Sequence, residues 1–596
     1  MRNLRQFRTH LEILKHSHPE LVVQLAPEPR GPSPVELSGA DDSQALKWNG
    51  KCLHSPKAPD AEAQRLLESF AFENNRVYVI FGAGLGHLPR RALEKLPAQS
   101  SLIVFEPDLR VFREVLGCVD LRAILFDPRA VWVSGPKWRE HLLIHLRHAE
   151  KAGRRPSTAI LSLPAYRTFF EATLYDIRSR LAQFINERVI DTQTRKTLTD
   201  LWNRNLTENL PYILDSTPLN LLTTTFKGVP FILVGAGPSL DDNLEAVSQL
   251  KSRALIAAVD TALAPLLRAG CDPDVVVAMD AQEENARDFA GVPPHSSILV
   301  YDAFCFPSIV PMYPPDRRIV SQTGHVLSDI DDLVVVKNGL LPLFDHLLDY
   351  EYGFLQSGGS VITCAFDLAR IAGCSAVGLV GVDFSLPGYL THSKLTNKFR
   401  AHIGEQSRFE TLETSSITGM SQRSRLRLDG AAGKDVWSDR VLVLYKHWME
   451  DASARSGIPC FRIGPHRGAK LTGYEPIGVD DFLTRFGVER ADIESRLGRC
   501  RGARPSIKPD DVRRRLTEFR NDLARLDRDS SIDRVGPFDL DRFVAMTSME
   551  ISERLTAILE LEPESEHPVR RQQASRACRD SVAPFLDRFE AALNSF

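Results

Sequence analysis

The chain has 596 residues, of which 43% are hydrophobic and 25% charged, and its formal net charge is -3 at pH 7. This length and composition predict an ordinary globular protein of roughly three or four domains. The nearly neutral charge provides no basic field for nucleic acid, and no stretch approaches the roughly 18 apolar residues that a membrane-spanning helix needs. We therefore expect neither a nucleic-acid partner nor a membrane span.

The nine cysteines are scattered along the chain and include no Cys-x-x-Cys pair. This pattern argues against a structural zinc site or a disulfide framework and indicates a reducing compartment. The first eight residues carry positive charge, but the apolar segment of a secretory signal does not follow them. These observations together predict a cytoplasmic protein.

The first glycine-rich turn lies in the amino-terminal part of the chain. The apolar run 77–81 ends at Gly82, Gly84 and Gly86, and a second apolar run ends at Glu106. These residues predict a Rossmann-like strand–turn–helix–strand unit, and an acidic residue about twenty positions after the glycines can bind a ribose in such folds. The arrangement also resembles the opening of an S-adenosylmethionine-dependent methyltransferase. No second motif supports methyl transfer, so whether this turn binds a ligand stays open. We favour the interpretation that the fold is inherited and that the turn binds no ligand.

The central motif follows a segment that is mainly helical by pattern. The apolar run 231–234 breaks at Gly235-Ala236-Gly237-Pro238-Ser239, and Ser239 begins a helical pattern. A strand that turns through glycines into a helix leaves backbone N–H groups that suit the phosphates of a nucleotide. Glycine is expected there because a side chain would keep the backbone away from its ligand. Taken alone, the motif fits close packing of a strand on a helix equally well.

Polar residues follow several later apolar runs of the same region. The residues that follow these runs are Asp260 and Thr261, then Asp280, then Ser357, Gly358, Gly359 and Ser360, then Asp383, and finally His392. Since α/β sheets bind their ligands at the carboxyl ends of the strands, we expect these residues to share one site. Asp260 and Asp280 do not form an Asp-x-Asp motif, and no metal site is predicted.

Two further segments complete the chain. Residues 394–439 are polar with little periodicity, which is typical of a lid, a binding loop or a disordered excursion. From Arg490 onward the pattern is helical and basic, and the apolar faces along 512–526, 543–559 and 585–593 predict a small helical bundle. Its arginines fit a solvated face better than a nucleic-acid site.

The sequence therefore predicts an α/β protein. We expect a smaller Rossmann-like amino-terminal domain over 1–150, a helical bridge over 151–220, a Rossmann-like central domain over 221–485 and a helical carboxyl-terminal domain over 486–596.

The order of these motifs resembles that of the Maf family, which are bacterial motility-associated proteins regarded as flagellin glycosyltransferases. Their central domain is shared with an archaeal pterin diphosphokinase, and its landmarks are similar to those of bacterial CMP-sialic acid-dependent sialyltransferases. The segment from Leu53-His54-Ser55 to the turn at 82–86 also looks like the Maf amino-terminal domain. The resemblance covers roughly residues 45–480. The chain departs from it at Ala236, where the sialyltransferases have Asn, and at Arg462-Ile463, where family members commonly have Asn.

The resemblance implies a glycosyltransferase that moves a nonulosonic acid, of the pseudaminic or legionaminic type, from its CMP conjugate to Ser or Thr of flagellin. It implies that His392 is the general base and that Asp383 binds the donor or orients a catalytic group. No obligatory cofactor or metal is implied. Asp241 and Asp242 lie where they would repel a phosphate close to the turn. The implied substrate-binding residues are Gly235, Ala236, Gly237, Pro238, Ser239, Asp260, Thr261, Asp280, Ser357, Gly358, Gly359 and Ser360.

Two other functions stay open. One is ATP-dependent pyrophosphoryl transfer to a 6-hydroxymethylpterin, which would need Mg²⁺ to manage ATP. The other is a non-catalytic protein of flagellar assembly or binding. The length of the chain favours glycosyl transfer, because a protein acceptor could use the added terminal domains. The sequence determines neither the sugar nor the accepting residue, and it is compatible with a homo-oligomer.

Overall fold

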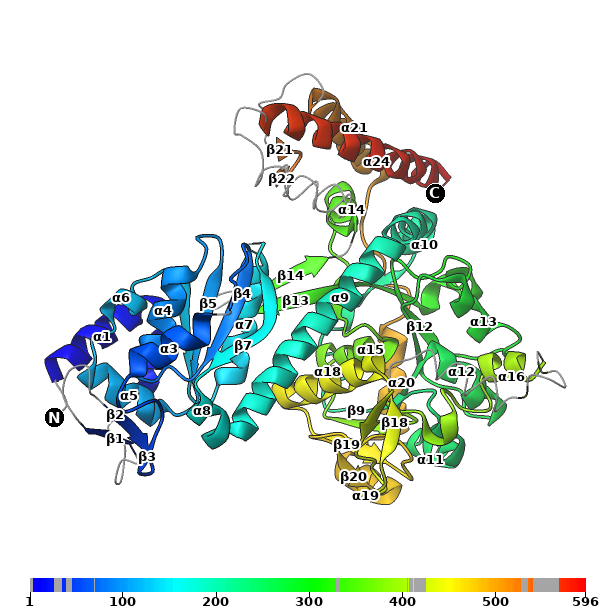
Figure 1. Cartoon of the computed structure of the whole chain (residues 1–596). Helices are drawn as coiled ribbons and strands as arrows, with labels where there is room; N and C mark the ends of the chain where they lie inside the picture. Colours follow the sequence, from blue (N-terminus) through cyan, green and yellow to red (C-terminus); the bar gives the residue numbers. More distant parts are fainter. Residues whose placement is uncertain are drawn as a thin grey trace. The chain divides into compact units, whose positions relative to one another are not determined.

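The computed structural model describes residues 4–25, 35–38, 45–68, 70–151, 153–328, 333–337, 339–404, 406, 411, 425–526, 534–539 and 567–595. The chain forms two compact units, and Figure 1 labels their helices and strands. Unit 1 consists of Met1–Ile190 with Leu327–Val334, and unit 2 consists of Asp191–Val326 with Val335–Phe596. The helix predicted over 543–559 lies outside the described residues. No helix in the described part of the chain is long and apolar enough to cross a lipid bilayer.

Unit 1 is built on a four-stranded parallel sheet in the order β6-β5-β4-β7. The strands are β4 (Arg76–Phe81), β5 (Ser101–Glu106), β6 (Ala130–Ser134) and β7 (Arg155–Ser162). The predicted glycine turn at 82–86 joins β4 to α4 (His87–Lys95). Every residue of β5 is buried, as expected for a parallel strand covered on both faces.

The other elements of unit 1 surround this sheet. The helices are α1 (Leu4–Ser17), α2 (Pro19–Leu25), α3 (Pro59–Glu68), α5 (Leu109–Cys118), α6 (Arg122–Leu125), α7 (Trp138–Lys151) and α8 (Pro164–Phe169). A small antiparallel sheet contains β1 (Val35–Ser38), β2 (Ala45–Trp48) and β3 (Lys51–Cys52). The long helix α9 (Glu171–Glu208) lies in the segment 151–220 that was predicted to be a helical bridge. The start of that segment is not bridge but β7 of the four-stranded sheet, so the amino-terminal fold extends beyond residue 150.

Unit 2 contains the large sheet, in the order β14-β13-β12-β11-β10-β9-β16-β19-β20, with β8 and β15 also paired to β13. All neighbours from β13 to β20 are parallel. The strands are β8 (Thr217–Pro218), β9 (Pro230–Val234), β10 (Leu255–Val259), β11 (Val275–Ala278), β12 (Ile298–Asp302), β13 (Arg318–Ser328), β14 (Leu333–Lys337), β15 (Phe354–Gln356), β16 (Ala376–Val380), β19 (Cys460–Ile463) and β20 (Glu475–Ile477). The predicted α/β class with a Rossmann-like arrangement is confirmed.

The strand order reverses beside β9. From β9 the chain adds β10, β11, β12 and β13 on one side, and β16 then pairs with the other side of β9. In an open parallel sheet, ligands bind at the carboxyl ends of the strands next to such a switch point. The topology therefore predicts a ligand site at the carboxyl ends of β9 and β16.

The sheet of unit 2 separates two apolar cores, because neighbouring residues of a strand face opposite sides. Val275 and Val277 of β11 pack in one core with Phe366 of α15 (Val361–Ile371). Val276 of the same strand packs in the other core with Leu263 of α12 (Asp260–Arg268). The other helices of unit 2 are α10 (Leu210–Leu214), α11 (Leu244–Leu250), α13 (Ala286–Phe289), α14 (Leu341–Leu348), α16 (Asn397–Gly404), α18 (Arg440–Ser456), α19 (Val479–Phe486), α20 (Arg490–Arg499), α21 (Pro509–Leu526) and α24 (His567–Ser595).

The carboxyl-terminal helices continue the core of unit 2. Phe519 of α21 and Phe589 of α24 share an apolar core with Phe344 of α14. Helix α20 belongs to the core of the large sheet, where Ile493 is fully buried. Arg490 at its first turn pairs with the buried carboxylate of Asp274, which precedes β11. The central fold therefore extends beyond residue 486 to the end of α20.

Candidate functional site

The turn after β9 is bonded along its length to the turn after β16. The backbone N–H of Gly235 donates to the carbonyl of Val380 at 2.9 Å, and that of Gly237 donates to the carbonyl of Gly381 at 2.8 Å. The N–H of Ser239 donates to Oδ2 of Asp383 at 2.8 Å. Pro238 has no N–H, so Ala236 is the residue of this turn whose N–H makes no hydrogen bond within the part of the chain that the structure describes.

The glycines of these turns are needed because the two backbones touch. A Cβ on Gly235 would lie 2.7 Å from the carbonyl oxygen of Gly381, and one on Gly381 would lie 2.3 Å from the carbonyl oxygen of Gly235. A Cβ on Gly237 would lie 2.5 Å from Oδ2 of Asp383. The sequence motif was expected to keep space for a ligand. The structure gives another reason for its glycines, which is contact between two turns of the same chain.

Asp383 lies behind the glycine turn and supports it. Its side chain is only 4% exposed, and burial raises the pKa of its carboxyl, while the Ser239 N–H opposes that shift. The backbone of Asp383 is covered in turn by the loop 464–470, since the N–H of Ala469 donates to the Asp383 carbonyl at 2.9 Å. Arg462, at one of the two places where the chain departs from the family pattern, donates to the Ala469 carbonyl at 2.7 Å. The hydrogen bond from the Ser239 N–H to Asp383 therefore helps to fix the position of the glycine turn.

The acidic residues beside the turn are held by partners from distant segments. Oδ1 of Asp241 accepts a hydrogen bond from the Ser393 hydroxyl at 2.5 Å, and Oδ2 accepts one from the Lys394 N–H at 3.1 Å. Asp242 pairs with the guanidinium of Arg467 at 2.5 Å. The sequence suggested that Asp241 and Asp242 would repel a phosphate near this turn. In the structure, both carboxylates already have a hydrogen-bond donor or a cation as partner.

A second group of carboxylates lies at the ends of β10 and β11. Asp260 begins α12, is 3% exposed, and accepts a hydrogen bond from the Thr261 N–H at 2.7 Å through Oδ1. Burial, together with the charge of Asp288, raises the pKa of Asp260 to about 7. The Thr261 hydroxyl donates to Asp288 at 3.1 Å, and Asp280 acts on the pKa of both Asp260 and Asp288. The structure thus brings Asp260, Thr261 and Asp280 together and adds Asp288 to them.

Asp302 is a further carboxylate that sequence reasoning missed. It ends β12 and is fully buried, and its Oδ1 accepts a hydrogen bond from the Phe304 N–H at 2.7 Å. Burial raises its pKa to about 7. The signal was present, because the run 298–301 ends in an aspartate just as the run before Asp260 does. Within the described residues, no group of three or more His, Cys, Asp or Glu side chains is arranged to hold a metal ion.

The turn at 357–360 lies between β15 and α15. The Gly358 N–H donates to the Thr363 hydroxyl at 2.9 Å, and the Gly359 N–H donates to the Ser357 hydroxyl at 3.1 Å. Ser360 is the N-cap of α15, but its side chain makes no capping bond. The ring of Trp448 from α18 lies against this turn, where a Cβ on Gly358 would come within 2.4 Å of it.

His392 lies on a segment that is anchored at both ends, Thr391–Lys398, which we call the strap. Near its start, the Ser393 N–H donates to the Ala236 carbonyl at 2.8 Å. Near its end, the Asn397 amide donates to the Arg287 carbonyl of α13 at 2.8 Å. Between these points, Arg268 of α12 donates to the carbonyl of Leu395. The strap therefore runs from the glycine turn to the helix that carries Asp288, and it is fixed by hydrogen bonds rather than loose.

His392 itself is half-buried at the start of the strap, and its Nδ1 lies 3.0 Å from the Thr391 hydroxyl.

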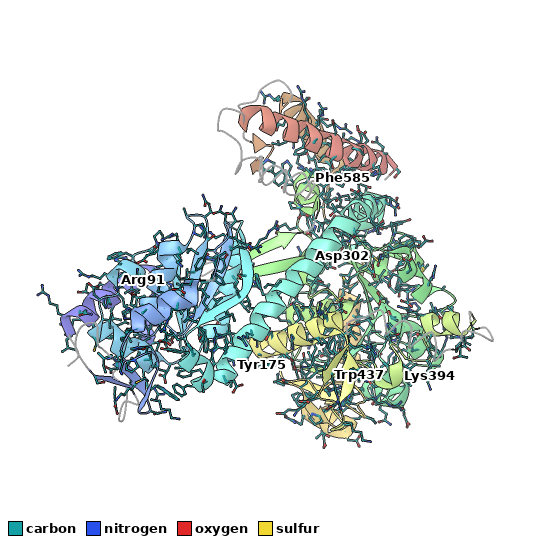
Figure 2. The ribbon with its side chains drawn as sticks, viewed as in Figure 1. Arg91, Tyr175, Asp302, Lys394, Trp437 and Phe585 are labelled. Atoms are coloured by element: carbon teal, nitrogen blue, oxygen red, sulfur yellow. The ribbon has the colours of Figure 1, made fainter. Side chains whose placement is uncertain are left out.

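The polar segment 394–439 continues beyond the strap, and the structure describes part of it. Residues 425–439 contain a hairpin of β17 (Leu426–Leu428) and β18 (Val436–Ser438). Residues 405, 407–410 and 412–424 lie outside the described part. Figure 2 labels Asp302 in β12, Lys394 on the strap and Trp437 in the hairpin.

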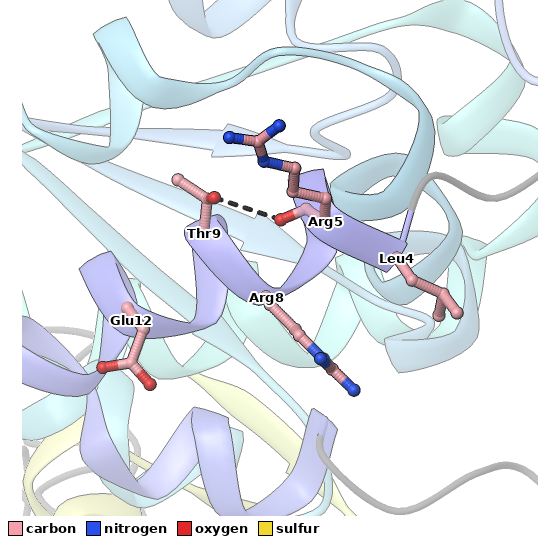
Figure 3. A pocket seen from close by; sticks show the side chains of 5 residues that line it. All are labelled: Leu4, Arg5, Arg8, Thr9 and Glu12. Carbon is pink, nitrogen blue, oxygen red and sulfur yellow. Dashed lines mark hydrogen bonds between the residues drawn. The ribbon is translucent and has the colours of Figure 1, made fainter.

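A surface hollow is present elsewhere, along α1 of unit 1 (Figure 3). It measures about 370 Å³ and is lined by Leu4, Arg5, Arg8, Thr9 and Glu12. The Thr9 hydroxyl donates back to the Arg5 carbonyl at 3.0 Å. The residues come from one face of a single helix and include none of the predicted site residues, so we do not assign the hollow to the candidate site.

Comparison with known proteins identifies similar folds. Residues 204–388 match the family described as 6-hydroxymethylpterin diphosphokinase MptE-like. The solved structure of a Maf glycosyltransferase from Magnetospirillum magneticum AMB-1 superposes with a TM-score of 0.52 and 14% identity, over 100% of this chain and 95% of that one. The chain has the fold of a Maf glycosyltransferase. The predicted likeness to Maf proteins, with a central domain of the pterin diphosphokinase type, is therefore confirmed at the level of fold.

Two sequence relatives are uncharacterized proteins of Treponema pallidum (strain Nichols). The first is 24% identical over 285 residues, which cover 46% of this chain and 48% of the relative. The second is 27% identical over 235 residues, which cover 36% of this chain and 58% of the relative. The chain thus spans about half the length of the curated relatives that it matches.

Replacing Gly235 with Ala is expected to destabilise unit 2, because the new Cβ would clash with the Gly381 carbonyl. Overpacking of this kind costs roughly 1–3 kcal/mol, to be measured as a lower free energy of unfolding in urea. Gly498→Ala is the matched control, since a Cβ on this helical glycine of α20 meets no atom within 4 Å. A Gly235→Ala protein of unchanged stability that no longer binds a nucleotide would show instead that the glycine serves ligand approach.

Asp302 is expected to make stability depend on pH. Its folded pKa of about 7 lies above the ordinary value, so the folded protein holds this proton more tightly than the unfolded chain does. Stability should therefore fall as the pH rises from about 4 to about 7, by up to roughly 2–4 kcal/mol, and level off above that range. Thermal unfolding across this range should show a smaller decline for Asp302→Asn than for the wild type. The exposed Asp316→Asn should keep the wild-type slope, and an unchanged slope in Asp302→Asn would contradict the assignment.

Proposed function

We propose that this protein is a glycosyltransferase that moves a nonulosonic acid, of the pseudaminic or legionaminic type, from its CMP conjugate to a Ser or Thr hydroxyl of flagellin. The extent of the structural likeness supports this proposal most. The match to the Maf glycosyltransferase covers 100% of this chain, including unit 1 and the carboxyl-terminal helices. The match to the MptE-like family covers residues 204–388 alone.

The donor is proposed to bind at the carboxyl ends of β9 to β12. The Ala236 N–H at the switch point is the group of the glycine turn best placed to meet a phosphate or the nucleoside, because the neighbouring N–H groups are bonded within the chain. Thr261 and the turn at 357–360 add hydroxyl groups to the same edge. Asp260, with a pKa of about 7, can either accept a hydrogen bond from a sugar hydroxyl or donate one at neutral pH.

The transfer step needs a base for the acceptor. The acceptor hydroxyl forms a bond to the anomeric carbon of the sugar, the bond from that carbon to the CMP phosphate breaks, and CMP leaves with the electron pair. The hydroxyl proton passes to His392, because imidazole is the side chain best suited to proton removal near neutral pH. The strap supports this role, since the Ser393 bond to Ala236 holds His392 next to the proposed donor position.

A second candidate is ATP-dependent pyrophosphoryl transfer to a pterin, which the match of residues 204–388 favours. This reaction would need Mg²⁺, which binds mainly to carboxylate and phosphate oxygens. Asp260, Asp280 and Asp288 supply carboxylates at the correct edge, but among the described residues no group of three or more ligands is arranged to hold a metal. We therefore derive no step through magnesium.

Isothermal titration calorimetry with CMP and with ATP in Mg²⁺ would separate the two candidates. We expect CMP to bind unit 2 of the full chain with a dissociation constant below about 1 mM, because the nucleotide of a donor must be held during transfer. We expect no ATP binding of comparable strength. Binding of ATP without binding of CMP would contradict glycosyl transfer and favour the kinase.

His392→Ala is expected to bind CMP as the wild type does but to transfer sugar more slowly by a factor of roughly 10²–10⁴, which is the usual contribution of a general base. The rate would be measured by mass spectrometry of flagellin incubated with the CMP-sugar. Lys394→Ala is the control, because Lys394 is exposed on the same strap and its bond to Asp241 is made by the backbone (Figure 2). Near-normal transfer by His392→Ala would remove His392 from the mechanism.

A further inference from the structure

The glycine turn of unit 1 has the position of a nucleotide site. β4 is flanked by β5 on one side and β7 on the other, so the switch point of this sheet lies between the carboxyl ends of β4 and β7. The turn at 82–86 follows β4, and Glu106 ends β5. In Rossmann folds the turn holds the pyrophosphate and the acidic residue holds the ribose.

Tyr166 occupies this position. It lies on the short helix α8 just after β7, and its side chain is fully buried. The ring lies directly on Gly82, where a Cβ would come within 2.3 Å of it. The Tyr166 hydroxyl accepts a hydrogen bond from the Gly84 N–H at 3.1 Å and donates one to Oε2 of Glu106 at 2.9 Å. The phenol thus contacts both the turn and the carboxyl group that a nucleotide would use.

The backbone donors of the turn are also engaged within the chain. The Gly82 N–H donates to the Phe105 carbonyl at 2.8 Å, and the Gly86 N–H donates to the Ala83 carbonyl at 2.9 Å. The Ala83 N–H donates to Oε2 of Glu106 at 3.0 Å. With the Gly84 N–H bonded to Tyr166, four of the five residues at 82–86 have their N–H groups engaged. A pyrophosphate that used these donors would have to break existing bonds.

Glu106 is likewise enclosed. Its Oε1 accepts a hydrogen bond from the Asp108 N–H at 3.3 Å, and its side chain is 1% exposed. Burial raises its pKa to about 8, although the bonds from Tyr166, Asp108 and Ala83 oppose the shift. A ribose could reach this carboxyl group only after Tyr166 had moved away.

We propose that Tyr166 is a built-in occupant of the nucleotide position of unit 1 and closes this unit to dinucleotides and to S-adenosylmethionine. The ring lies against the turn, where a pyrophosphate would bind, and the hydroxyl takes the place of a ribose hydroxyl at Glu106. Unit 1 keeps the Rossmann-like fold, with Tyr166 bonded to the Gly84 N–H and to Glu106. The N–H groups of Gly82, Ala83 and Gly86 are bonded to other parts of the same unit. We therefore expect the protein to bind its nucleotide in unit 2.

The test uses phenol, which has the shape of the missing side chain. Tyr166→Ala in the full chain should leave a buried cavity, and phenol at ten times its dissociation constant should raise the melting temperature of this variant by roughly 3–5 °C. Tyr175→Ala is the matched control, because Tyr175 lies in the same unit and is 75% exposed (Figure 2). Phenol should raise the melting temperature of neither the control nor the wild type. An equal effect of phenol on all three proteins would overturn the proposal.

Calorimetry of the wild type with NAD⁺ and with S-adenosylmethionine is the second arm. We expect no binding at 82–106, and saturable binding of either ligand that Glu106→Gln abolishes would overturn the proposal.

Tyr166→Phe keeps the test decisive if Tyr166→Ala does not fold. This variant retains the ring and removes the partner of the Gly84 N–H. Its Gly84 amide should exchange with deuterium at least about tenfold faster than in the wild type, whereas the Gly82 amide, bonded to Phe105, should keep its rate. Unchanged exchange at Gly84 would contradict the assigned role of the Tyr166 hydroxyl.

Discussion

The close contact between the turn after β9 and the turn after β16 is the constraint on which the rest of unit 2 depends. Gly235 and Gly381 approach so closely that neither position has room for a Cβ. Asp383 secures the contact through the Ser239 N–H, and burial of this carboxyl group makes the bond hard to replace with water. Because the two turns belong to strands on either side of the switch point, this contact also determines what the open edge of the sheet presents. It uses the donors of the glycines and leaves the Ala236 N–H.

The strap adds a second layer to the same edge. It is fixed to the glycine turn through Ser393 and to α13 through Asn397, so the segment that carries His392 is bonded both to the turn and to the helix of Asp288. Asp241 takes part in this attachment, which explains how acidic residues can lie beside a proposed phosphate position. This arrangement fits the proposed transfer, in which the donor binds at the strand ends and His392 of the strap is the base.

Each unit has a glycine-rich turn after a strand, and in each the turn is contacted by another part of the same unit. In unit 1 the partner of the turn is the ring of Tyr166, and in unit 2 it is the backbone of Gly381. Trp448 does the same at Gly358. A Gly-x-Gly turn after a strand is therefore evidence of close approach, and the approaching group can come from the protein as readily as from a ligand.

Local patterns in the sequence predicted the strands and their ends well. The apolar run before Asp260 and the break at Gly235 identified β10 and β9, and the α/β class followed from them. What the pattern could not show was pairing between distant segments. The bond from Ser239 to Asp383 joins residues 144 apart, and Tyr166 reaches Gly84 from 82 residues away with no motif around it. Helix α20 was assigned to the carboxyl-terminal segment because its charged surface is visible in the sequence, whereas the burial of Ile493 against the sheet is not.

Hydrogen–deuterium exchange of the full chain with and without CMP would show which of the two glycine turns binds the nucleotide. If CMP binds unit 2 as proposed, exchange should slow at 235–242, at 260–261, at 357–360 and along the strap 391–398, with no change at 82–106. Protection at 82–106 with none at the ends of β9 to β12 would contradict this proposal.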